Sequence, residues 1–319
     1  MTYTRRGVLT ALIAAAGTVK AQRSSRKVWN PKLGILARFT EGNLDFAKQE
    51  GFKSLQLRVE KDILDPNMTD EQAEKVRATL RRFGLYLSAI NLSQNHVSPD
   101  ADERKRANAA FGKAIELAGR LGVPFVATSS GTLPGRPLAE QVDEIVRIYT
   151  ERYFPLCQKF NVRILWEPWA GGPNIATGPV GFEALFKAFN NSPYVGLQYD
   201  PSHLVWQMMD PIQCERDFVD KIYDVHLKDI EILWRVLRRT GINPLNNERW
   251  WRFRLPGFGL IDWKAFFTVL MDAGYQGAMN IEHEDPLYYP AYSGAEFTEQ
   301  GKEGYRISHR FLRPLVPEA

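Results

Sequence analysis

The sequence contains little cysteine and no long hydrophobic run. Cys157 and Cys214 are the only cysteines among 319 residues, too few for a disulfide framework, and their spacing fits no metal-ligand motif. The apolar stretch near the N-terminus is too short and too rich in alanine and glycine to be a stable membrane anchor. A low-complexity tract, a tandem repeat and a break in composition are also missing. These absences favour one large domain.

Once residues 1–21 are set aside, the sequence also lacks an excess of positive or negative charge. The chain has 41 basic and 37 acidic residues, but residues 1–21 contain Arg5, Arg6 and Lys20 and no acid, which leaves 41 − 3 = 38 basic residues. A nearly neutral remainder gives no electrostatic footprint for nucleic acid. The arginine pair, the short apolar stretch and Ala21 at a cleavage point predict a twin-arginine-type signal peptide and a periplasmic protein. A disordered basic tail is the alternative.

From about residue 31, short β-rich runs alternate with longer amphipathic ones. Residues 69–84 are typical of the amphipathic runs, because Thr69 and Asp70 suit a helix start and Gly84 suits its end. The alternation predicts a single (β/α)8 TIM barrel over residues 22–319. An open doubly wound sheet is the competitor, but residues 34–43 do not supply its glycine-rich phosphate turn. The predicted strands cover residues 32–38, 54–59, 86–92, 124–130, 162–168, 194–200, 222–229 and 277–284.

One connection interrupts the regular alternation. Residues 230–258, between the predicted seventh strand and the helix that follows it, are long for a strand-to-helix loop. Long loops on this fold usually cover the site, so a lid or pocket wall is expected here.

Polar residues occupy the carboxyl ends of the last four predicted strands, where barrel enzymes place their chemistry. Singly, each has an ordinary explanation, such as a helix cap for Asp200 before Pro201. Together, three converging carboxylates would repel one another unless a cation joined them. Three oxygen ligands and one imidazole suit Mn²⁺ best, with Mg²⁺, Co²⁺ and Zn²⁺ as alternatives. The predicted ligands of this one divalent cation are Glu167, Asp200, His226 and Glu282.

The motifs WEPW, YDPSH, VHLKD, RLPGFGLIDW and IEHED, in this order, resemble the xylose-isomerase-like superfamily of sugar phosphate isomerases and epimerases. The resemblance covers almost the whole chain after the signal. It implies the same four metal ligands, with Glu167 and Glu282 as the catalytic acid/base pair. It also implies proton abstraction next to a carbonyl, through an enediolate that the cation stabilises.

Further side chains near these strand ends are predicted to bind substrate. The resemblance places His203 near substrate or metal, and Lys228 shares the strand face of His226. Tryptophan rings pack against sugar rings, although tryptophan is also common in barrel cores. For His96, an ordinary loop residue is an equally good interpretation. The predicted substrate-binding residues are His203, Lys228, His96, Arg252, Arg254 and Trp169.

Several functions remain open. A metal-dependent isomerase or epimerase acting on a small-molecule sugar is the first prediction. The alternative is a lyase or hydratase acting on 3-keto sugars or glycosides with the same metal and glutamates, since the motif pattern also resembles a branch with such substrates. A three-zinc nuclease is disfavoured because the second strand ends in Arg58 rather than histidine. A non-catalytic sugar-binding protein would not need both glutamates. The sequence leaves the substrate and any homo-oligomer undetermined.

Overall fold

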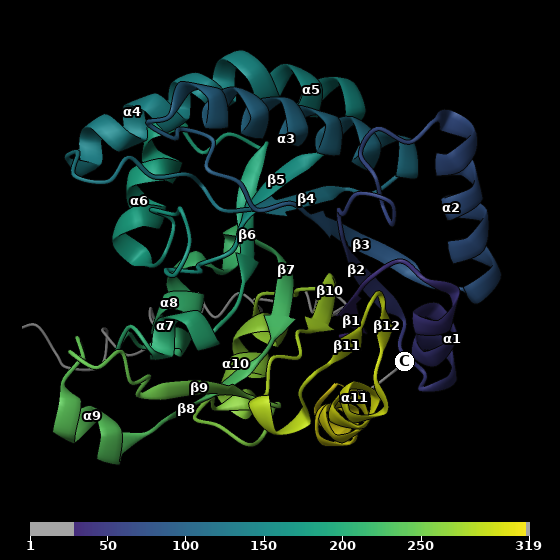
Figure 1. Cartoon of the computed structure of the whole chain (residues 1–319), viewed down its shortest axis with the longest axis vertical. Coiled ribbons are helices and arrows are strands. Elements are labelled where there is room, and N and C mark those ends of the chain that lie inside the picture. Colours follow the sequence, from purple (N-terminus) through teal and green to yellow (C-terminus); the bar gives the residue numbers. More distant parts are fainter. Residues whose placement is uncertain (1–28, 317–319) are drawn as a thin grey trace, which may run out of the picture.

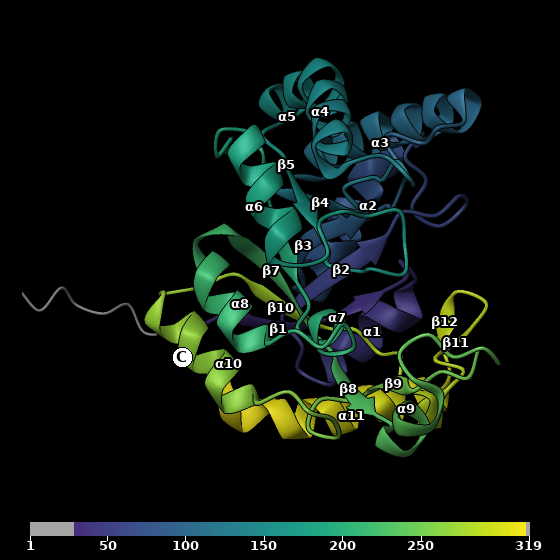
Figure 2. The same cartoon turned by 90° about the vertical axis from the view of Figure 1, so that its left-hand side faces the viewer.

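The computed structural model describes residues 29–316, so the predicted signal peptide, residues 1–21, lies outside the described residues. Eight parallel strands close into a barrel in the order β1-β10-β7-β6-β5-β4-β3-β2, with helices around it (Figures 1 and 2). The predicted (β/α)8 fold is therefore confirmed. The barrel strands are β1 (Lys32–Ala37), β2 (Ser54–Arg58), β3 (Tyr86–Asn91), β4 (Phe125–Thr128), β5 (Arg163–Trp166), β6 (Val195–Tyr199), β7 (Ile222–Leu227) and β10 (Ala278–Ile281).

Local signals in the sequence set the limits of the outer helices. Thr69 and Gln72 form a reciprocal capping box at the start of α2, and Gly84 ends that helix with φ 68°. No helix of residues 29–316 is both long and apolar enough to cross a bilayer. The helices are α1 (Glu41–Gln49), α2 (Asp70–Phe83), α3 (Ala101–Leu121), α4 (Leu138–Ile148), α5 (Phe154–Phe160), α6 (Pro179–Ala188), α7 (Ser202–Val205), α8 (Pro211–Phe218), α9 (Trp234–Thr240), α10 (Trp263–Asp272) and α11 (Glu299–Leu312).

Two parts of the helical layer are irregular. Helices α4 and α5 are separated by a π-helical turn at Tyr149–Tyr153, and both terminal tyrosines of this turn are buried. The C-terminal helix, α11, begins only at Glu299. The residues before it form a small hairpin of β11 (Tyr292–Ser293) and β12 (Glu296–Phe297), because Gly294 takes φ 59° in the turn.

The long connection after β7 has its own structure. Strands β8 (Asp229–Ile232) and β9 (Trp251–Arg254) pair antiparallel, and α9 lies in the segment of chain that connects them. This hairpin lies beyond the carboxyl end of β7 (Figure 1). It is anchored by buried Asp229, whose carboxylate accepts bonds from Gly257 N, Ile261 N and Trp263 Nε1 at 2.9–3.1 Å.

Apolar side chains fill the layer between strands and helices, whereas the inside of the barrel is polar. Trp166 of β5, for example, is fully buried against Phe186 of α6. Cys157 and Cys214 are both buried and unpaired. The barrel interior contains buried polar side chains from several strands: Ser54, Gln56, Ser88, Gln198, Asp224 and Asn280.

Candidate metal centre

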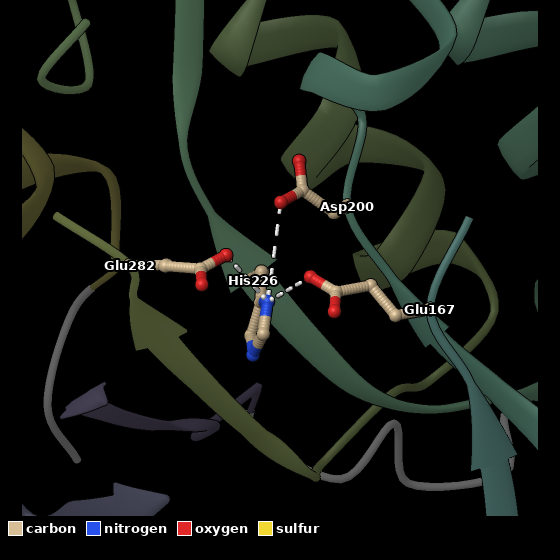
Figure 3. A group of neighbouring side chains, drawn as sticks. All are labelled: Glu167, Asp200, His226 and Glu282. Carbon is tan, nitrogen blue, oxygen red and sulfur yellow. Dashed lines mark hydrogen bonds and ion pairs between the residues drawn. The ribbon is translucent and has the colours of Figure 1, made fainter. Parts of the chain in front are cut away.

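Four ligand-type side chains meet where the last four barrel strands end. Glu167, Asp200 and Glu282 each follow directly after a strand, and His226 lies within β7. One ligand atom from each lies within 4.8 Å of the others. Figure 3 shows the three carboxylates directed at the His226 ring, whose Nδ1 is 2.9 Å from Glu167 Oε1, 3.1 Å from Glu282 Oε2 and 3.9 Å from Asp200 Oδ2.

Parallel strand pairing explains why these residues converge. His226 pairs in register with Asn280, so Glu282, two residues further along the chain from Asn280, lies on the same face of the barrel wall. The two carboxylate oxygens of Asp200 have different surroundings. Its Oδ1 accepts bonds from Ser202 N at 2.9 Å and Ser202 Oγ at 2.6 Å, which fixes the carboxylate beside the first residue of α7. Its Oδ2 is directed at the cluster.

Basic side chains lie close to Glu167 and Glu282. The Lys228 ammonium, itself buried, lies 2.6 Å from Glu282 Oε2, 3.1 Å from Asp200 Oδ2 and 3.0 Å from Glu284 Oε2. Burial by itself raises the pKa of Glu282, but Lys228 and His226 outweigh it and hold that pKa well below its usual value. Burial and Glu282 likewise raise the pKa of Glu167, yet His226 and His203 leave it lowered. Both glutamates are therefore held as carboxylates.

The pKa of His226 changes in the opposite direction. Burial lowers it, but the charges of Glu282 and Glu167 outweigh burial and leave the pKa well above its ordinary value. In the absence of another cation, the imidazole is therefore held in its charged form by the two carboxylates beside it.

The residues present fit a divalent cation. Three carboxylates and one imidazole are a hard, mainly oxygen donor set. Asp200 Oδ2 is fully buried and forms no hydrogen bond, although Lys228 Nζ lies 3.1 Å away outside hydrogen-bond geometry. A buried carboxylate oxygen without a hydrogen bond is costly unless another cation meets it.

A cavity of about 430 Å³ opens onto the metal centre. Its lining combines a partly apolar wall, which includes Trp169 and Phe253, with polar side chains such as Arg58, Asn91 and Ser93. Such a cavity suits a small polar ligand that also presents an apolar face.

Three of the predicted substrate-binding residues line this cavity. His203 Nε2 lies 3.5 Å from both Glu167 Oε1 and Asp200 Oδ2, and 3.3 Å from Lys228 Nζ. The Trp169 ring packs 5.0 Å from the His203 ring, centroid to centroid. His203, Lys228 and Trp169 can therefore reach a ligand in the cavity.

His96 does not lie on the cavity lining, in contrast to its prediction as a substrate-binding residue. It is fully buried behind β4, with Nδ1 2.9 Å from Tyr153 Oη and Nε2 3.0 Å from Thr128 Oγ1. Both ring nitrogens are already used. Desolvation also lowers the pKa of His96 to about 3, which keeps the ring neutral.

Arg252 and Arg254 also lie outside the cavity lining, in contrast to their prediction. Side chains alternate along β9, so Phe253 faces the cavity and both arginines face the other side. There they bind Glu231 Oε2 at 2.7 and 2.8 Å, and Arg254 also binds Asp285 at 2.9 Å. These ion pairs hold the hairpin of β8 and β9 together.

Two charged residues that line the cavity were not predicted from the sequence to bind substrate. Arg58, the last residue of β2, has a half-exposed side chain, and its one ion pair is a 3.8 Å contact to Glu282 Oε1. Glu284 lines the cavity and binds Lys228. The strand-end rule, applied to the second strand as it was to the last four, would have identified Arg58.

Comparison with known proteins agrees with the observed fold. Residues 44–315 match the family described as a xylose isomerase-like TIM barrel. The uncharacterised protein YfiH of Bacillus subtilis is 28% identical over 287 residues, which covers 78% of this chain and 90% of YfiH. Inosose dehydratase of Clostridium tetani is 37% identical over 94 residues, covering 29% of this chain and 32% of the dehydratase. The E. coli 3-keto-D-glucoside 4-epimerase YcjR shares the fold, with a TM-score of 0.66 at 16% identity, covering 89% of this chain and 99% of the epimerase.

Proposed function

The chain belongs to the xylose isomerase-like TIM-barrel family, and from that premise we propose that it is a divalent-metal-dependent isomerase or epimerase of a keto sugar. The observation that carries the proposal is the convergence of Glu167, Asp200, His226 and Glu282 within 4.8 Å at the cavity. The similarity of fold to a 3-keto-D-glucoside 4-epimerase supports the substrate class.

These four residues would hold one divalent cation, with Mn²⁺ favoured by the carboxylate majority. When bound, the cation supplies a Lewis acid, which lowers the free-energy cost of the negative charge that forms on substrate oxygens as a neighbouring carbon loses its proton. All remaining steps belong to side chains of the protein.

Glu167 and Glu282 are the proposed acid/base pair. Both are held as carboxylates, so either can accept a proton from carbon. They approach His226 from opposite sides (Figure 3). A substrate carbon placed between them would lose its proton to one glutamate. The other glutamate, after taking up a proton from solvent, would return it on the opposite face, which inverts the configuration of that carbon.

Other side chains orient the reactants. Lys228 fixes the carboxylates of Glu282 and Asp200 by direct contact. Arg58 has guanidinium N–H groups free of hydrogen bonds to the described residues and lines the cavity, so it can donate to sugar hydroxyls. The ring of Trp169 offers a flat surface for the apolar face of the sugar.

A lyase or hydratase is the second candidate, favoured by the local similarity to an inosose dehydratase. The same proton abstraction leads to elimination when the next carbon carries a hydroxyl that is protonated as it leaves. The pair of Lys228 Nζ and His203 Nε2, 3.3 Å apart beside the metal centre, is the natural proton donor for that hydroxyl.

One experiment tests both candidates. The purified protein, saturated with Mn²⁺, is incubated in D₂O with free ketoses, 3-keto glycosides and inosose, and each sugar is followed by proton NMR and mass spectrometry. An epimer or isomer carrying one deuterium supports the first function, and a product that has lost water supports the second. Absence of exchange with every sugar, while Mn²⁺ is bound, would contradict proton abstraction.

A further inference from the structure

A chain of buried amide groups connects the metal centre to an aspartate deeper in the barrel. Gln56 of β2, Gln198 of β6 and Asp224 of β7 all have no exposed surface. His226 Nε2 lies 2.5 Å from Gln56 Oε1. The amides of Gln56 and Gln198 pair head to tail at 3.3 and 3.0 Å, and Gln198 Nε2 donates to Asp224 Oδ2 at 2.7 Å.

The direction of these hydrogen bonds is set from the Asp224 end. Both oxygens of Asp224 accept hydrogen bonds from amides, Oδ2 from Gln198 and Oδ1 from Asn280, so Gln198 presents its NH₂ group to Asp224. The second N–H of that group then donates to Gln56 Oε1, and the Gln198 oxygen accepts from Gln56 Nε2. This fixes the Gln56 amide with its oxygen toward His226.

The orientation of Gln56 in turn decides which nitrogen of His226 keeps its proton when the ring gives one up to bind a metal. An amide oxygen is an acceptor, so His226 Nε2 must be the protonated nitrogen. Nδ1, on the side where the three carboxylates lie, is then the nitrogen that can lose its proton and offer a lone pair to a metal.

We propose that Gln56, Gln198 and Asp224 form a positioning relay that holds His226 with Nε2 protonated and offers Nδ1 to the metal. The proposal rests on the proposed metal-dependent function and assigns roles to three residues that contact neither substrate nor cation. It also explains why a barrel interior usually filled with branched apolar side chains contains paired amides here. A histidine ligand with a fixed tautomer loses less freedom when the cation binds, so the relay raises metal affinity.

The test compares Gln56→Met, which is nearly isosteric and has no amide acceptor, with Gln198→Met, which breaks the next link. Leu57→Met is the matched control, because Leu57 is a fully buried neighbour on β2 outside the relay. Mn²⁺ affinity is measured by titration calorimetry. The tautomer is read from ¹⁵N NMR of the Zn²⁺-loaded protein labelled at its 5 histidines.

The unaltered protein should show His226 with metal-bound Nδ1 and a slowly exchanging Nε2–H. Gln56→Met should weaken Mn²⁺ binding by about 10- to 100-fold, the usual loss when a partner of a metal-binding histidine is removed. Gln198→Met should weaken it less, and Leu57→Met should change neither affinity nor the His226 resonances. A role in packing alone would make the Leu57 and Gln56 variants alike.

Two results would overturn the relay while leaving the proposed function intact. One is Mn²⁺ affinity of Gln56→Met within twofold of the unaltered protein. The other is metal bound through Nε2 of His226. Failure of the unaltered protein to bind Mn²⁺ at all would instead remove the proposed function and the relay's role together. If Gln56→Met did not fold, Gln198→Met and the tautomer of the unaltered protein would still decide the question.

Discussion

Replacing Glu282 with glutamine separates its proposed role as a base from its role in the local charge network. The glutamine side chain keeps the size and one oxygen of the original but cannot accept a proton from carbon. In the unaltered protein, Glu282 Oε2 contacts Lys228 Nζ at 2.6 Å and His226 Nδ1 at 3.1 Å. We expect Glu282→Gln to abolish most turnover while the protein still folds and still binds sugar.

The size of each effect can be estimated from the contacts. Losing a positioned acid/base group slows turnover by about 10²- to 10⁴-fold, or about 2.7 to 5.4 kcal/mol in the activation barrier. The cost in folding free energy should be smaller, about 1–3 kcal/mol. Lys228 retains Asp200 and Glu284, and His226 retains Glu167, so neither cation is left without a carboxylate.

Glu284→Gln is the matched control. Glu284 lies two residues away, shares the Lys228 contact and lines the same cavity, but it is not a member of the metal-binding quartet. Its carboxylate is more exposed, so loss of the ion pair should change turnover by a factor of about five at most. Both variants are assayed by the initial rate of deuterium exchange at saturating Mn²⁺, and sugar binding is measured separately by calorimetry.

The outcome depends on the comparison of the two variants. Nearly unchanged exchange by Glu282→Gln at saturating Mn²⁺ would refute its assignment as a base. An equal loss of exchange and of sugar binding would show that Glu282 acts mainly by holding the site together. Equal losses in Glu282→Gln and Glu284→Gln would assign the effect to Lys228 rather than to the base.

Three further predictions concern stability and processing. Mn²⁺ at 100 times its dissociation constant should raise the unfolding free energy by about 2.7 kcal/mol, and the increase should vanish with EDTA or in Asp200→Asn; an equal increase in that variant would locate the ion elsewhere. Burial raises the pKa of Glu215 to about 9, and neither of its oxygens has a hydrogen-bond partner among the described residues. The folded state therefore binds an extra proton between pH 4.5 and about 9. As pH rises over this range, the unaltered protein should lose up to about 1.4 kcal/mol of stability per pH unit relative to Glu215→Gln, as measured by urea unfolding. Parallel pH profiles of the two proteins would contradict this. We also propose export by the twin-arginine route, so N-terminal sequencing of periplasmic protein should begin near Gln22, and an intact Met1 would contradict cleavage.

The fold was predictable because its signals are local. Each barrel strand is a short β-rich run, and each outer helix has an apolar face and recognisable ends, as Thr69 and Gly84 show for α2. The exceptions have tertiary causes. The π-helical turn at Tyr149–Tyr153 accompanies the packing of both tyrosine rings against His96, a contact between segments about 50 residues apart that no local pattern encodes.

The convergence of the four predicted ligands was also predictable, because consecutive parallel strands bring their carboxyl ends to one rim. The surrounding residues were harder to assign. Arg252 and Arg254 looked suited to bind substrate, but the register of β9 against β8 turns them toward Glu231. His96 belongs to a loop in the sequence, yet its neighbours in space, Tyr153 and Thr128, satisfy both ring nitrogens.

The sequence by itself determined the alternation of strands and helices, the closed barrel that follows from it, and the strand ends that bear the carboxylates and the imidazole. These properties depend on side-chain periodicity and on helix capping, which extend over a few neighbouring residues. Only the tertiary structure decided that Arg58 faces the cavity and that Gln56 meets His226 and Gln198 inside the barrel. Such contacts join residues more than 100 positions apart, and their geometry exists only after strand order and register are fixed.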